Sequence, residues 1–196
     1  GGSIAVNAQN LNLSEGSQLL AGISGVGLPN TQAGNIEINA TGTVTIRDGS
    51  SIANEVGLGS VGNAGNINIT AESLSLSNFS FLSASTKGQG DAGNIAITTG
   101  SLSTERSFLN ASMNGQGNAG NITINASDSV LFDGTGIYTD VAKIDNLDDN
   151  PVIGNGGDVS ITTESLSITN GSILAASANG RGDAGEITIN VRDTAS

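Results

Sequence analysis

The sequence predicts an all-β fold, a right-handed single-stranded parallel β-helix (β-solenoid) with about three short strands in each coil. The first observation is a repeat, in which Gly-Asn-Ile-x-Ile begins at Gly34, Gly65, Gly93 and Gly120. The second is the spacing of apolar residues two positions apart, which places both side chains on one face of a strand. The third is the clustering of glycine and polar residues between these pairs, where turns are expected.

Looser copies of the motif extend the repeat along the whole chain. The units start near Gly2, Gly34, Gly65, Gly93, Gly120, Gly157 and Gly185. Neighbouring starts lie 27 to 37 residues apart, a period typical of solenoids whose units stack on one another. We therefore expect a single domain over residues 1–196 with six to seven coils, and a fragment of a longer array. Crossovers between parallel strands are right-handed, which gives the expected hand.

The first strand of each coil follows the Gly-Asn pair. The expected inward pairs are Ile4/Val6, Ile36/Ile38, Ile67/Ile69, Ile95/Ile97, Ile122/Ile124, Val159/Ile161 and Ile187/Ile189. The residue after the first glycine forms another column, made of Asn35, Asn66, Asn94, Asn121, Asp158 and Glu186. Stacked amide side chains can form hydrogen bonds along the axis, so we predict a structural ladder in this column.

The second and third strands complete each coil. Inward positions of the second strand are Leu11/Leu13, Val44/Ile46, Leu74/Leu76, Leu102, Val130/Phe132 and Leu166/Ile168, and Thr104 interrupts this column. Those of the third strand are Leu19/Ala21, Ile52, Leu82/Ala84, Leu109/Ala111 and Leu174/Ala176. The recurring alanine predicts a narrow corner, where larger side chains would collide.

Composition argues against several classes of function. The formal net charge is −12 and the six basic residues are scattered, so no nucleic-acid partner is expected. No apolar run is long enough for a membrane-inserted helix. The chain has no cysteine and no histidine, which excludes disulfides and the Ser-His-Asp and Cys-His catalytic sets. Most acids stand singly in turns, so we predict no enzyme activity and no cofactor.

The fifth unit is the longest, and its extra residues predict a loop insertion over residues 139–155. Long insertions in solenoids project from one face and often carry function. Asp140 begins this segment, and Asp145, Asp148 and Asp149 offer oxygen ligands of the kind that Ca²⁺ prefers. Their spacing does not match the alternating acids of an EF-hand loop, so a solvated loop is the favoured interpretation.

Two further features could form an interaction surface. Phe81 and Phe108 occupy the same position in adjacent units and would point outward if Leu82 and Leu109 point inward. An outward aromatic pair is a platform for sugars or partners, and the alternative is that a turn covers both rings.

The second feature is the tripeptide Arg181-Gly182-Asp183, which is typical of receptor-binding loops. The equivalent turn of an earlier unit reads Gln89-Gly90-Asp91, so the tripeptide is interpreted as a one-residue variant of a structural turn.

The repeats resemble those of filamentous haemagglutinin-like exoproteins, above all the large repetitive ones of cyanobacteria. The resemblance is carried by Gly-Asn-Ala-Gly-Asn-Ile at 62–67 and 117–122, and by Ser-Leu-Ser-Ile-Thr-Asn-Gly-Ser-Ile-Leu-Ala-Ala-Ser at 165–177. It implies a right-handed β-helical shaft, export by an outer-membrane partner and a role in adhesion or surface structure. The Asn-Pro-Asn motifs typical of the family's secretion domain are absent, because Asn150-Pro151 is followed by Val152. The chain is therefore expected to be shaft.

The expected function is a structural and adhesive shaft segment of a secreted or cell-surface exoprotein. Its expected partners are cell-surface glycans or other copies of itself. A self-assembling extracellular filament or sheath subunit is the first alternative, and a fragment of a carbohydrate-active β-helix enzyme is the second. A groove lined by two or three acids would favour the enzyme.

Overall fold

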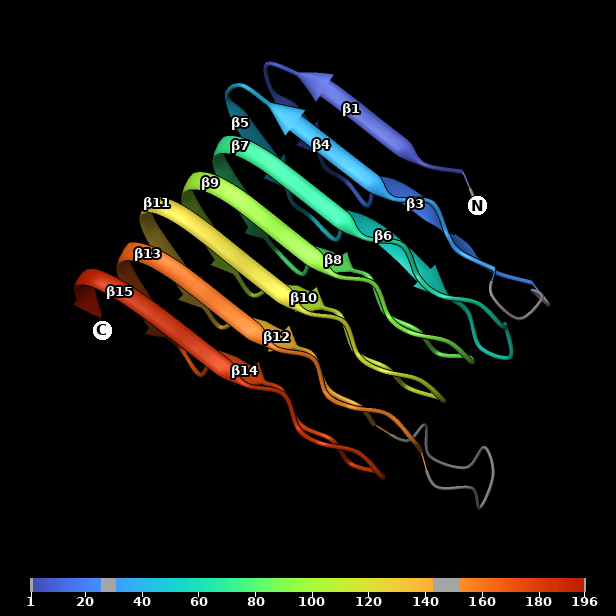
Figure 1. Cartoon of the computed structure of the whole chain (residues 1–196). Coiled ribbons are helices and arrows are strands. Elements are labelled where there is room, and N and C mark those ends of the chain that lie inside the picture. Colours follow the sequence, from blue (N-terminus) through green and yellow to red (C-terminus); the bar gives the residue numbers. More distant parts are fainter. Residues whose placement is uncertain (1, 26–30, 143–151, 196) are drawn as a thin grey trace.

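The computed structural model describes residues 2–25, 31–142 and 152–195, and these form a parallel β-helix that contains no α-helix (Figure 1). Every strand pairing among them is parallel, and successive coils stack along one axis. No helix long and apolar enough to cross a membrane occurs in these ranges. The predicted fold class is confirmed.

Two sheets run the length of the stack. The large sheet holds β1 (Ile4–Ala8), β2 (Leu11–Leu13), β4 (Ile36–Ala40), β5 (Thr43–Ile46), β7 (Ile67–Ser77), β9 (Ile95–Glu105), β11 (Ile122–Asp133), β13 (Val159–Thr169) and β15 (Ile187–Ala195). The small sheet holds β3 (Gln18–Ile23), β6 (Ser51–Val56), β8 (Phe81–Ser83), β10 (Phe108–Asn110), β12 (Gly136–Tyr138) and β14 (Ile173–Ala175). In both sheets, strands from neighbouring coils lie side by side.

The strand register follows the repeat. Ile67 of β7 pairs with Ile36 on one side and Ile95 on the other, and Ile122 continues the column. Like side chains therefore stack on like along the axis, at the spacing of about 4.8 Å that separates neighbouring strands. This register turns the sequence repeat directly into a continuous core.

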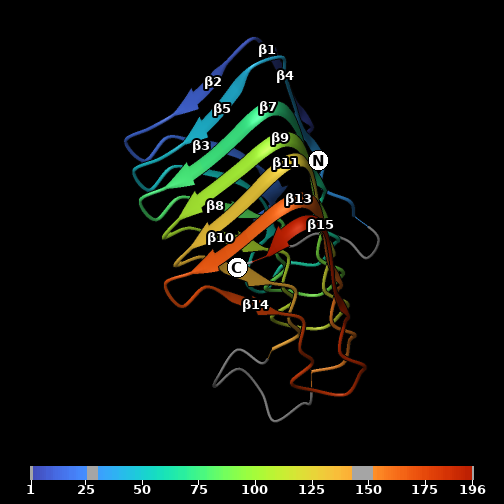
Figure 2. The same ribbon diagram turned by 90° about the vertical axis from the view of Figure 1, so that its left-hand side faces the viewer.

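The first and second strands expected in each coil are joined in most coils. In β7, β9, β11 and β13 one strand runs through both segments and bends between them (Figure 2). Between the two segments lies a small buried side chain, which is Ala71, Thr99, Ala126 or Thr163. Thr99 also satisfies the backbone there, because its hydroxyl donates to the carbonyl of Ser101 at 3.0 Å. The prediction of three separate strands therefore holds only for the first two coils, where residues 9–10 and 41–42 interrupt the pairing.

The core consists of the predicted inward columns. Buried members include the Ile36/Ile38, Ile67/Ile69, Leu74/Leu76, Ile95/Ile97, Ile122/Ile124 and Val159/Ile161 pairs and the third-strand residues Leu82 and Leu109. Ile137 of β12 also belongs to the third column, between Leu109 and Leu174, and was not among the residues predicted for that column. Thr104 is buried as well, and it stands beside the large ring of Phe132.

The predicted narrow corner lies where the small sheet meets the next coil. The backbone N–H groups of Gly93 and Gly120 donate to the carbonyls of Ala84 and Ala111, each at 2.8 Å. A Cβ on Gly120 would overlap the carbonyl of Gly93 in the preceding coil. Glycine is therefore required at this position, and alanine opposite it keeps the corner closed.

A second, smaller core fills the loops that extend beyond the small sheet. Met113, Val141 and Val152 are buried there, with Ala119 and Ala178 packed against them. The loops run out and back in stacked pairs at the lower right of Figure 1. These loops are thus a regular part of the solenoid.

Candidate interaction surfaces

The side chain of each asparagine in the predicted ladder bonds to the next coil. The Oδ1 atoms of Asn35, Asn66 and Asn94 accept hydrogen bonds from the backbone N–H groups of Asn66, Asn94 and Asn121, at 3.0, 2.9 and 2.8 Å. Asp158 continues the series by accepting from the N–H of Glu186 at 2.8 Å. The expected axial bonding is present, but it joins side chain to backbone rather than amide to amide. The ladder has a structural role.

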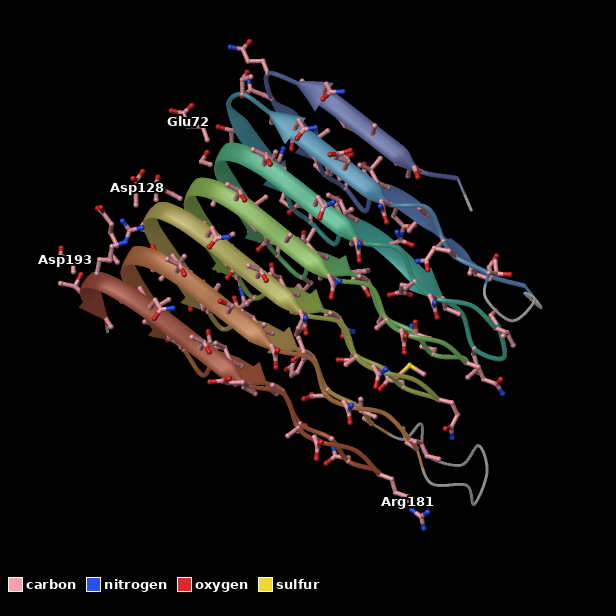
Figure 3. All side chains as sticks on the ribbon, viewed as in Figure 1. Glu72, Asp128, Arg181 and Asp193 are labelled. Carbon is pink, nitrogen blue, oxygen red and sulfur yellow. The ribbon has the colours of Figure 1, made fainter. Side chains whose placement is uncertain are left out.

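The Arg181-Gly182-Asp183 turn belongs to a second ladder of this kind. The N–H of Asp183 donates to Oδ1 of Asn155 at 2.9 Å, as that of Asp91 does to Asn63 at 2.8 Å. A Cβ on Gly182 would overlap the carbonyl of Gly154. The backbone of the tripeptide is therefore the regular structural turn, as interpreted from the sequence, and Arg181 projects from its tip (Figure 3).

The candidate ligands in the long loop fall largely outside the described residues. Asp145, Asp148 and Asp149 lie in the segment 143–151, which the structure does not describe. Asp140 is described and half-buried, and its Oδ1 accepts from both the N–H and the hydroxyl of Ser177 at 2.8 Å. Asp140 thus links the fifth coil to the sixth. Within the described ranges, no group of three or more acidic side chains could hold a metal ion.

Two acids share one axial column beside the small sheet, Glu55 and Asp140. Glu55 accepts a hydrogen bond from Ser83 at 2.5 Å and contacts the ammonium group of Lys87 at 3.5 Å. Three strand spacings separate the coils of Glu55 and Asp140, which corresponds to about 14 Å. Glycosidases hold their carboxyl groups about 5 to 9.5 Å apart. These two acids therefore do not form the carboxylate pair that would favour a glycosidase.

A row of acids also follows the bend of the large sheet. Glu72, Asp128 and Asp193 lie along one edge in Figure 3, with Glu164 at the corresponding bend of β13. All four are exposed. These acids add to the negative charge of the surface along the bend.

The two phenylalanines singled out from the sequence point outward. Phe81 and Phe108 pair directly across β8 and β10, and the alternate residues Leu82 and Leu109 are fully buried. Phe108 is 39% exposed and Phe81 is half-buried. Of the two interpretations that the sequence left open, the outward one is therefore correct.

Tyr138 extends this pair by one coil. The position after Phe108 in the column is Gly136, which has no side chain. The ring of Tyr138 lies where a Gly136 Cβ would be, so that the tyrosine fills the vacant place. Sequence reasoning missed this contribution because Tyr138 is two residues from the column, and only the glycine at 136 hints at it.

Phe79 adds a fourth aromatic residue at the turn before β8. It is 64% exposed, and its N–H donates to the carbonyl of Arg106, which stands two residues before Phe108. Phe79 therefore lies in the turn through which the chain enters the small sheet, two residues before the outward Phe81. We call Phe79, Phe81, Phe108 and Tyr138 the aromatic row.

No family model, curated protein or solved structure matches the chain. Its function is therefore inferred from its own residues. Among the described residues, the aromatic row and the outer edges of β1 and β15 are surfaces to which the ladders assign no structural role.

Proposed function

We propose that the chain is a structural and adhesive shaft segment of a secreted or cell-surface exoprotein. The observation that carries the proposal is the uninterrupted stacking of both sheets, in which every strand except the outermost ones of each sheet has a partner on each side. Such a stack lengthens by about 4.8 Å for each added coil without needing a new core design. It suits a role in holding binding features away from a cell.

The surface and the repeats support the same role. The outward positions of the large sheet are mainly serine, threonine and asparagine, and the net charge of −12 favours solubility of a long rod. The likeness of the repeats to filamentous haemagglutinin-like exoproteins supports export by an outer-membrane partner. The absence of cysteine is compatible with export of an unfolded chain.

The proposal is tested by locating the protein. An antibody raised against the purified chain is applied to intact source cells, to permeabilised cells and to the culture medium. We expect labelling of intact cells or signal in the medium. Labelling only after permeabilisation would contradict the proposal, and an antibody against a cytoplasmic protein controls for leakage.

A second candidate function, end-to-end self-assembly, is favoured by the terminal strands. Ile187 and Ile189 of β15 are 40% and 41% exposed, and β15 pairs with β13 alone among the described residues. At the other end, Ile4 and Val6 of β1 lie in the same column. The edge of β15 in one copy could therefore pair with that of β1 in a second.

Light scattering over a range of concentrations tests this assembly. A second copy stacked on β15 predicts a mass that rises with concentration, and Ile189→Lys should abolish the rise by placing a charge in the contact. A chain that stays monomeric at every concentration would contradict self-assembly and leave the shaft proposal intact.

A further inference from the structure

The turn that carries Phe79 has a conformation that suits glycine. Asn78 and Phe79 have φ values of 54° and 62°, both in the left-handed region. The equivalent position in three other coils is Gly16, Gly49 or Gly171, with φ between 70° and 73°. A bulky side chain is strongly disfavoured at positive φ, so phenylalanine weakens a turn that glycine would stabilise.

The strain at Phe79 is not compensated by burial in the fold, because 64% of the residue is exposed. Strained, exposed residues of this kind are typical of functional sites rather than of cores. Phe79 also lies two residues before Phe81, at the turn that leads into β8 and the column of outward aromatic residues. The strain and the cluster are independent observations, and both point to contact with a partner at this place.

The geometry of the row fits a long, thin ligand. Phe81, Phe108 and Tyr138 come from successive coils, so their rings follow one another along the axis at about 4.8 Å per coil. The row is one side chain wide, and Asn110 lies two residues after Phe108 on the same outward face of β10. The amide nitrogen of Asn110 donates to no group within the described ranges. An apolar strip beside polar groups complements a sugar, which has an apolar C–H face and hydroxyl groups at its edge.

The small exposed area of the aromatic row and the negative charge of the chain limit the class of partner. A stable protein interface buries about 800 Å² on each partner, whereas two of the four side chains in the row are half-buried before any ligand arrives. Glu105 is paired with Arg106 at 2.7 Å, so the local charge beside the row is nearly balanced. The whole chain has a formal net charge of −12, which repels polyanions. A neutral glycan needs less contact area than a protein partner, and the negative charge of the chain does not repel it.

We propose that the aromatic row binds a neutral linear polysaccharide that lies along the helix axis. This inference rests on the adhesive role proposed above and gives that role a site. Phe79, Phe81, Phe108 and Tyr138 would stack on the apolar faces of successive sugar rings, and Asn110 would donate to a hydroxyl group.

The test is calorimetric titration of the purified chain with a soluble linear neutral β-glucan and with its sulfated derivative of matched length. We expect saturable binding of the neutral polymer only. Phe108→Ser should weaken it about tenfold, the loss expected when an aromatic anchor is truncated. Leu131→Ser is the matched control, because Leu131 is also 39% exposed but lies on the outer face of the large sheet. The control variant should bind like the unmodified chain.

Phe79→Gly separates binding from folding. It should raise the melting temperature by relieving the turn and at the same time weaken binding, a combination that general damage to the fold does not produce. Equal binding by the Phe108→Ser and Leu131→Ser variants would overturn the inference. So would failure of the chain to bind the neutral polymer, or preference for the sulfated one.

A concentration-dependent dimer that Phe108→Ser removes would mean that the aromatic row binds a second copy of the chain. That result would overturn the inference that it binds a glycan. The antibody experiment and this titration test different proposals, so each proposal can be refuted without the other. Row-dependent glycan binding by a protein found only inside cells would refute the surface location and leave the site standing.

Discussion

The Ile-x-Ile pair of β9 and the pair of β15 have the same pattern and opposite surroundings. Ile95 and Ile97 are 0% and 1% exposed, whereas Ile187 and Ile189 are 40% and 41% exposed. The interior pair is enclosed by β7 and β11, and the terminal pair has β13 on one side only. The comparison shows that in a solenoid a residue is buried by the neighbouring coils rather than by its own unit.

The largest difference between the two regions should come from a buried charge. Ile95→Asp places a carboxylate in the core without a partner, and we expect it to lower the free energy of unfolding by about 4 kcal/mol or more. Ile187→Asp leaves its carboxylate partly in water and should lower the free energy of unfolding by only about 1 kcal/mol. Urea unfolding of both variants, followed by circular dichroism, measures the difference. Equal losses would mean that the interior pair and the terminal pair are packed alike.

A glycine comparison isolates the close approach of the coils. Gly2 and Gly120 occupy the same repeat position, but a Cβ on Gly2 meets nothing within 4 Å and one on Gly120 overlaps the carbonyl of Gly93. Gly120→Ala should therefore cost about 3 kcal/mol through overpacking, and Gly2→Ala should be close to neutral. Thermal unfolding of the two variants provides the measurement. A neutral Gly120→Ala would show that the corner can open without loss.

A buried pair of hydroxyl groups also lies in the interior coils. The hydroxyls of Thr104 and Thr135 are 2.7 Å apart and both residues are buried. Thr104→Val keeps the shape but leaves the Thr135 hydroxyl with weaker partners, so we expect a loss of about 2 kcal/mol. The double variant Thr104→Val with Thr135→Val should recover part of it. A double variant that loses the sum of the two single effects would contradict coupling between the hydroxyls.

Much of the fold could be predicted because its information is local and repeated. The period-two pairs and the recurring Gly-Asn motif identified the columns, and Ala84 and Ala111 indicated the narrow corner. Ile137 was missed because Gly136 and Thr139 replace the phenylalanine and alanine that mark the third strand elsewhere.

The candidate site was predicted less completely. Phe81 and Phe108 stand in register and are visible in the sequence, but the lean of Tyr138 over Gly136 depends on three-dimensional packing. Alignment of the repeat units could have singled out Phe79, since three other coils have glycine at its position. Its meaning became clear only with the φ angle of 62° and the exposure of the ring.

The smallest expected difference between interior and terminal coils concerns the asparagine ladder. In the interior, Asn94 accepts from the N–H of Asn121 at 2.8 Å. Asn94→Ala removes that acceptor from a partly exposed backbone donor, so we expect a loss of about 1 kcal/mol. At the end of the ladder, Glu186 accepts from no following coil within the described residues, and Glu186→Ala should change stability by less than about 0.5 kcal/mol.

The contrast is measured by hydrogen exchange as well as by melting temperature. Asn94→Ala should speed exchange of the Asn121 amide while leaving the amides of β13 protected, because each rung joins only adjacent coils. Rapid exchange throughout the stack would instead mean that the ladder acts cooperatively along the axis. In that case the terminal coils would depend on hydrogen bonds of interior coils that they do not touch. The stability of a coil would then not be set by its nearest neighbours alone.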